Sequence, residues 1–218
     1  MEKEAIVAWA KARMLSTDEV PLEIGYRYYH GLRVAALALE LVNAESLVVN
    51  QELLFIGALL HDVGKAGDKG KGHGPRGAEL IQKQIPHLFG QDELERVTQI
   101  VAYHYMRPKS KYMLGKPDPG WPQEVLLVQD ADTLDHFGAN GIWIAHHFAT
   151  VEKRNQQSSI DRHIMEDEAW KQESQQAMNY PAALRELEHR ISCMDNFVWQ
   201  WAREEQGQLT FRRLEEQL

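Results

Sequence analysis

Several histidine and aspartate side chains fall on the apolar faces of predicted helices, where they could hold a metal ion. Each lies three or four positions from apolar residues and therefore shares their face. One histidine on such a face usually indicates a hydrogen-bonded core residue, because an unpaired buried polar group is costly. Four, from separate helices, favour a divalent cation, whose ligands include imidazole and carboxylate. They are His30, His61, His104 and Asp132.

The dipeptide His61–Asp62 sharpens this prediction, because it ends an apolar predicted helix immediately before Gly64. Adjacent helical residues point about 100° apart. At the end of a helix, however, a long imidazole and a short carboxylate can reach one ion from different directions. A site at the start of a glycine-rich segment also leaves room for water and substrate.

Helices must position these residues, since the apolar pattern is helical almost throughout and few runs alternate with a period of two. The expected helices span 1–14, 25–44, 50–63, 76–84, 92–106, 122–135, 138–153, 165–178 and 181–206. Asn50 suits the N-cap of the third helix, and Pro181 suits the first turn of the last. Long loops are expected at 64–77 and 107–121, and a polar surface connection at 154–164.

The composition limits the class of protein. Of 218 residues, 44% are hydrophobic and 26% are charged, which is typical of a globular chain of one domain. The net charge of -8 argues against binding of a nucleic-acid polymer, but not against a small anion beside a metal ion. The single cysteine, Cys193, excludes an internal disulfide and a thiolate metal site. Neither a signal peptide nor a membrane span is evident, so a cytoplasmic protein is expected.

Five short motifs occur in an order that resembles the HD-domain superfamily of helical metal-dependent phosphohydrolases, and in particular its small single-domain bacterial members. They are His30, LLHDVGK at 59–65, HGPRGAELI at 73–81, IVAYH at 100–104 and VQDADTLDHFGANG at 128–141. The resemblance covers about 25–150 and implies an all-α HD-type helical bundle. We expect one domain over 1–218, in which 151–218 is a helical extension that packs on the core.

The resemblance assigns the metal ligands residue by residue. The family's first histidine, its His-Asp dyad and its distal aspartate match His30, His61, Asp62 and Asp132. Asp130 competes for the last position but lies about 200° around the helix from Asp132. The apolar stripe and the Ala-Asp-x-Leu context both favour Asp132. The resemblance also implies a catalytic role for Asp62, which would bridge the ions if two bind.

Further roles are left open beside simpler interpretations. His73 and His104 match positions that hold a second metal in some members, or they could bind phosphate; otherwise His73 is a loop residue and His104 a core histidine. Some family nucleotidases carry an acidic residue at the position of Lys65 as the catalytic acid, whereas other members, including cyclic-dinucleotide hydrolases, carry lysine. This departs from the nucleotidase pattern, and we expect Lys65 to hold phosphate as a point charge during catalysis. Arg33 could do the same or form a surface ion pair. Asp135 could orient a ligand or move a proton, or it could be a surface charge.

The expected activity is hydrolysis of a phosphate ester or anhydride of a small molecule, with a nucleotide as the expected substrate. Manganese, iron, nickel, cobalt or magnesium would activate the attacking water, as one ion or two. The alternatives are a di-iron oxygenase, in which His73 and His104 help to hold the second iron, and a non-catalytic metal-binding or sensing module. The last third of the chain could pack on the core or form the surface of a homodimer.

Overall fold

Helices account for the regular structure of the chain. The computed structural model describes residues 1–15, 25–65, 72–107, 120–165 and 167–209, and these residues form helices and no strand. The predicted all-α fold is therefore confirmed. No described helix combines the length and apolar character that a membrane crossing requires. Most of the proline-rich segment 107–121, which the sequence predicts to be a loop, lies outside the described residues.

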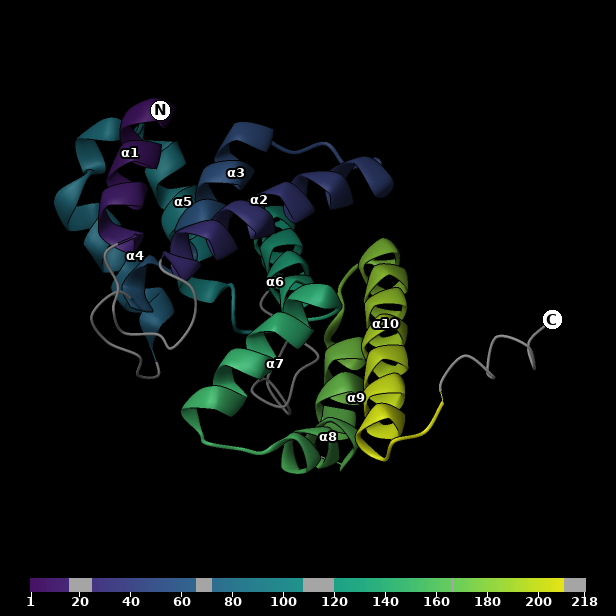
Figure 1. Cartoon of the computed structure of the whole chain (residues 1–218). Coiled ribbons are helices and arrows are strands. Elements are labelled where there is room, and N and C mark those ends of the chain that lie inside the picture. The colour runs from purple at the N-terminus through teal and green to yellow at the C-terminus, as the bar shows by residue number, and fades with distance from the viewer. Residues whose placement is uncertain (16–24, 66–71, 108–119, 166, 210–218) are drawn as a thin grey trace.

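The helices follow one another in the order that Figure 1 labels. Their bounds are α1 (Lys3–Met14), α2 (Tyr26–Ala44), α3 (Gln51–Leu60), α4 (His73–Gln84), α5 (Gln91–Tyr103), α6 (Gln123–Asp135), α7 (Ala139–Val151), α8 (Gln156–Met165), α9 (Asp167–Ala177) and α10 (Pro181–Glu205), with short 3-10 helices η1 (Val63–Lys65) and η2 (Pro86–Leu88).

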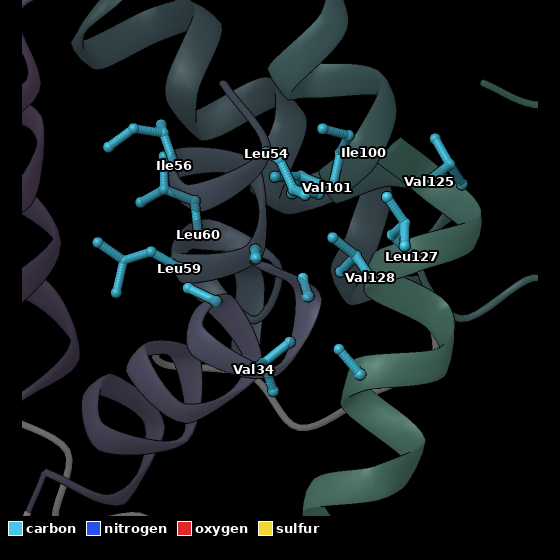
Figure 2. Close-up of a cluster of buried hydrophobic side chains, with 14 of the residues drawn as sticks. Val34, Leu54, Ile56, Leu59, Leu60, Ile100, Val101, Val125, Leu127 and Val128 are labelled. Carbon is cyan, nitrogen blue, oxygen red and sulfur yellow. The ribbon is translucent and has the colours of Figure 1, made fainter. Parts of the chain in front are cut away.

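The main core lies where α2, α3, α5 and α6 pack against one another. Figure 2 shows apolar side chains from these helices turned toward a shared interior, among them Val34, Leu54, Val101 and Val128. All four are fully buried. Their spacing is that of the predicted apolar stripes, so the stripes are the faces along which the helices meet. The ionisable residues on the same faces are carried into the interior.

Two helix ends are fixed by local chemistry that the sequence contains. The side chain of Asn50 accepts a hydrogen bond from the backbone N–H of Leu53 at 3.1 Å, which confirms the predicted N-cap of α3. Pro181 begins α10, as its fixed backbone angle favours. Helix α3 is shorter than predicted, because the chain leaves it at His61 and turns into η1.

The prediction of a polar surface connection at 154–164 is wrong, because most of these residues belong to helix α8. Helix α8 packs against α10 and α9. It buries Ile160 together with the polar residues Ser159 and His163. Since one face of α8 is made mostly of small and polar residues, apolar periodicity does not reveal it.

The C-terminal helices form a second group in the molecule. Figure 1 shows α7, α8, α9 and α10 together, on the side of α6 away from α1. Helix α10 packs on α6 and α2 and so connects this group to the main core. Asp130 strengthens the connection, because its carboxylate accepts hydrogen bonds from the backbone N–H groups of Asn179 and Tyr180 at the start of α10.

Candidate metal centre

The four expected metal ligands meet in space. His30 comes from the second turn of α2, His61 caps α3, Asp62 follows it, and Asp132 comes from α6. The Nε2 atom of His30 lies 3.1 Å from that of His61 and 3.2 Å from Oδ1 of Asp132. Ligand atoms about 2.1 Å from one ion lie roughly 3 to 3.5 Å apart. The arrangement therefore has the spacing of a coordination shell.

Hydrogen bonds fix which nitrogen of each imidazole faces the centre. Nδ1 of His61 donates to the carbonyl of Ala58 at 2.7 Å, and Nδ1 of His104 donates to the carbonyl of Val101 at 2.8 Å. A carbonyl can only accept, so these Nδ1 atoms carry the proton and their Nε2 atoms present lone pairs. Burial also lowers the pKa of His61 to about 3. His61 is therefore neutral near pH 7 and can donate electrons to a cation.

His30 lies between two carboxylates. Its Nδ1 donates to Asp135 at 2.7 Å, and its Nε2 faces Asp132. Burial acts to lower the pKa of His30, but hydrogen bonds with Asp132 and Asp135 raise it to about 9. This position of the fold therefore stabilises positive charge, which either a proton or a metal ion supplies.

The carboxylate of Asp62 is the group that fits a cation best. It is 1% exposed, and among the described residues its Oδ1 has no hydrogen-bond partner. Its Oδ2 accepts from Lys65 at 2.8 Å and from Arg27 at 3.4 Å. Burial acts to raise the pKa of Asp62, but the positive charge of Lys65 beside it holds that pKa well below its usual range. A buried, ionised oxygen without a donor requires compensation, and a divalent ion would provide it.

A second group of ligands shares this oxygen. Oδ1 of Asp62 lies 3.5 Å from Nε2 of His73 and 3.6 Å from Nε2 of His104, and the two imidazole nitrogens are 3.0 Å apart. Burial lowers the pKa of His73 to about 4, so that this imidazole is also neutral near pH 7. These three residues could hold another ion, with Asp62 between the two positions.

Asp135 lies behind His30 and is fully buried, which excludes its interpretation as a surface charge. Its carboxylate accepts from His30, from Nε and Nη2 of Arg33 at 2.8 and 3.0 Å, and from the Asn140 amide at 3.0 Å. Burial acts to raise the pKa of Asp135, but the bonds with His30 and Arg33 hold it far below its usual range. The carboxylate thus fixes the ring of His30, and Arg33 pairs with it through two nitrogens.

Sequence reasoning missed three groups that touch the two ligand aspartates. Arg27 and Arg107 approach the Oδ2 atoms of Asp62 and Asp132, each at 3.4 Å. His136 lies with Nε2 3.5 Å from Oδ1 of Asp132. The signal for His136 was its position four residues after Asp132, on the same face. Arg27 had a similar signal, three residues before His30, whereas Arg107 follows the end of α5 and has no helical pattern to mark it.

Asp130, the competitor of Asp132, points elsewhere. Its carboxylate accepts hydrogen bonds from the backbone N–H of Asn179 at 3.0 Å and from the side-chain amide of Asn179 at 2.8 Å. It also accepts from the backbone N–H of Tyr180 at 2.9 Å. It is fully buried beneath the start of α10. Asp130 therefore anchors the C-terminal helices, whereas the carboxylate of Asp132 lies beside the Nε2 atoms of His30 and His61.

The chain is similar to a known protein family and to several solved structures. The HD domain family model matches residues 27–136, just over half of the chain. Bacillus subtilis YpgQ in complex with ADP is similar in structure, with a TM-score of 0.63, 21% identity, and coverage of 93% of this chain and 94% of YpgQ. No curated protein matches the sequence.

Two further structures are described as HD-superfamily hydrolases. One from Bacillus thuringiensis has a TM-score of 0.66 and 24% identity, over 94% of this chain and 97% of its own. One from an uncultured Thermotogales bacterium, described as a predicted member, has a TM-score of 0.61 and 21% identity, over 92% and 91%. These structures show that the fold is shared, and the histidine and aspartate groups of this chain could hold a metal ion. The match over half of its length shows that the chain belongs to the HD domain family.

Proposed function

We propose that this protein hydrolyses a phosphate ester or anhydride of a small molecule, and that the substrate is a nucleotide. The observation that carries the proposal is the buried Oδ1 of Asp62, which faces three imidazole nitrogens and no hydrogen-bond donor among the described residues. Such an oxygen is suited to a divalent cation, and divalent cations are common catalysts of phosphoryl transfer. The ADP bound to the similar protein YpgQ supports a nucleotide as the substrate.

We expect the residues of the candidate site to have separate roles. His30, His61, Asp62 and Asp132 would hold the ion, and Asp135 keeps His30 in the orientation that binds it. When bound, a divalent ion lowers the pKa of water toward neutrality and polarises a phosphoryl oxygen. In the reaction a water oxygen attacks phosphorus, the bond from phosphorus to the leaving oxygen breaks, and that oxygen takes up a proton.

Cationic side chains around the centre favour an anionic substrate. Lys65 is part-exposed, with its ammonium group on Asp62, and Arg107 is part-exposed beside Asp132. Both can contact a phosphoryl group while they remain near the ligand carboxylates, and so offset the charge that develops during transfer. His136 is about one third exposed at the same edge and can exchange a proton with the leaving group.

Metal reconstitution tests the proposal. Stripped protein would receive manganese, iron, nickel, cobalt or magnesium singly, followed by a panel of nucleotides with phosphate and pyrophosphate release as the readout. We expect turnover with at least one metal and its loss in Asp62→Ala. Asp92→Ala, which removes an exposed aspartate from the first turn of α5, is the matched control and should retain activity. Full activity of metal-free Asp62→Ala would refute the proposal.

A di-iron oxygenase is the second candidate, because His73, His104 and Asp62 form a ligand group beside the first. Oxygen distinguishes the two activities. A hydrolase turns over equally in air and under anaerobic conditions, whereas an oxygenase stops without oxygen. Iron-loaded protein that consumes oxygen and releases no phosphate from any nucleotide would favour the oxygenase.

A further inference from the structure

A cavity of about 440 Å³ opens beside the candidate metal centre, among residues of α7, α8, α9 and α10. His136 belongs to both places, since it lines the cavity and its Nε2 lies 3.5 Å from Oδ1 of Asp132. Figure 1 shows these four helices gathered at one side of α6, the helix that carries Asp132. A cavity of this size suits a small organic ligand. A phosphoryl group at the centre would direct the rest of its molecule here.

The walls of the cavity are largely apolar. One wall is a stripe of α7 with helical spacing, made of Gly141, Ile144, Ala145 and Phe148. It extends about 10 Å along the helix. Met194 and Trp170 add apolar surface from α10 and α9, and the Trp170 ring stacks on Phe137 with 4.1 Å between centroids. This stacking holds the indole in a fixed plane, so the cavity favours a flat ring over a flexible chain.

The lining also includes two arginines. Nε of Arg154 and Nη1 of Arg162 lie 3.1 and 3.3 Å from the same Oε2 of Glu152. Both guanidinium groups line the cavity, and no described residue lining it is acidic. A guanidinium group only donates hydrogen bonds. The ligand must therefore present acceptor atoms to these arginines.

We propose that this cavity binds the base of a nucleotide, and that it prefers a base with an oxo group, such as hypoxanthine or guanine. The flat ring would lie against the apolar walls, and its carbonyl oxygen and ring nitrogen would accept hydrogen bonds from Arg154 or Arg162, the pairing that arginine favours with guanine. Adenine presents an amino donor at the same position and would face donors. The link from this cavity to catalysis rests on the proposed function, but binding of a base does not require hydrolysis.

Inosine and adenosine provide a matched pair of probes, because they differ only in an oxo or amino group at one ring position. Saturation-transfer NMR on the full-length, metal-stripped protein would give their dissociation constants, with ribose as the control ligand. We expect inosine to bind about tenfold more tightly than adenosine, as one charge-assisted hydrogen bond allows, and ribose to show no saturation. Either Arg162→Gln or Arg154→Gln should abolish the preference, according to which arginine donates to the oxo group. Arg185→Gln, an equal charge change at an exposed residue of α10, should retain it.

A second variant keeps the test valid if Arg162→Gln does not fold. Ala145→Leu places a larger side chain in the cavity and should weaken inosine binding by tenfold or more. Equal affinity for inosine and adenosine, or undiminished binding of inosine to Ala145→Leu, would overturn the proposal. The proposal would also be overturned if inorganic phosphate bound to these arginines and inosine showed no saturation transfer. If inosine bound but no nucleotide were hydrolysed, only the proposed function would be contradicted. If the protein hydrolysed p-nitrophenyl phosphate but did not bind inosine, only the base site would be contradicted.

Discussion

The ring orientation of each imidazole in the centre depends on the partner of its Nδ1 atom. For His61 and His104 that partner is a backbone carbonyl three residues earlier, so the helix end itself sets the orientation. For His30 it is the side chain of Asp135, which a single substitution can change. A partner of this kind also makes the imidazole a stronger metal ligand, because it favours positive charge on the ring.

Asp135→Asn tests this dependence. An amide oxygen can still accept from His30, but the negative charge is lost, and with it the ion pair between Asp135 and Arg33. We expect the affinity for a divalent metal to fall by about 10- to 100-fold, which is typical when such a partner of a metal-binding histidine is removed. Competition with a chromophoric chelator would measure the change. Asp161→Asn, at an exposed residue of α8, serves as the control. Equal metal affinity in wild type and Asp135→Asn would show that the carboxylate does not support the ligand.

The residues that could be predicted from the sequence are those that interrupt an apolar stripe. His30, His61 and His104 each stand out in this way, and the structure brings them together. Asp62 is marked by its place beside His61 at the end of an apolar helix. The role of Asp135 needed the structure, because the sequence also allowed a surface charge. Arg107 could not be found, since it depends on how the end of α5 meets α6 and not on any local pattern.

At the scale of elements, the turn after the His-Asp dyad decides where His73 lies. The 3-10 helix η1 packs against α4 at Gly64, where an added Cβ would come within 2.0 Å of the His73 carbonyl oxygen and 2.6 Å of the Gly77 nitrogen. Only glycine permits this approach of two backbones. The close contact places the first residue of α4 beside Asp62.

Gly64→Ala should therefore disturb both the packing and the second ligand group. The methyl group meets backbone atoms, which cannot rotate away, so we expect a loss of about 1–3 kcal/mol of unfolding free energy. Urea unfolding would measure it. Gly90→Ala is the comparison, because an added Cβ there meets only the flexible carboxylate of Glu93, at 3.3 Å; its cost should stay near the ~1 kcal/mol of an N-cap change. A loss in Gly64→Ala no greater than that of Gly90→Ala would argue against the close packing.

The sequence predicts the helices that carry apolar stripes better than those that do not. The stripes of α2, α3 and α6 are visible as periodic apolar residues, and these helices form the buried core. Helix α8 has no such stripe, because the face that packs on α10 includes Ser159 and His163. The sequence also places the start of α4 too late, at residue 76, because glycines at 72 and 74 suggest a loop. In the structure this helix begins at His73.

For the whole molecule, the candidate centre connects parts of the chain that are far apart in sequence. Its ligands come from α2, from the end of α3 and from α6, and the second group adds the start of α4 and the end of α5. The unfolded chain cannot present these residues at one point. Metal binding is therefore coupled to folding, because the ion binds the folded state in preference to the unfolded one.

The size of this coupling follows from mass action. At a free metal concentration 100 times the dissociation constant, the folded state gains about 2.7 kcal/mol. For a chain of this length, each kcal/mol shifts the midpoint of thermal unfolding by about 2–4 °C. We therefore expect a bound metal to raise that midpoint by roughly 5–10 °C and a chelator to reverse the rise. Calorimetry on the stripped and reconstituted protein would measure it.

Asp62→Ala separates this coupling from non-specific effects of metal and chelator. The variant lacks the oxygen shared by both ligand groups, so its unfolding midpoint should not respond to metal at the same concentration. Asp92→Ala removes the same charge from an exposed position and should respond as wild type does. An equal rise in wild type and Asp62→Ala would mean that metal stabilises the fold through another part of the chain. A response confined to proteins that retain Asp62 would tie the stability of the helical core to the centre on which the proposed hydrolysis depends.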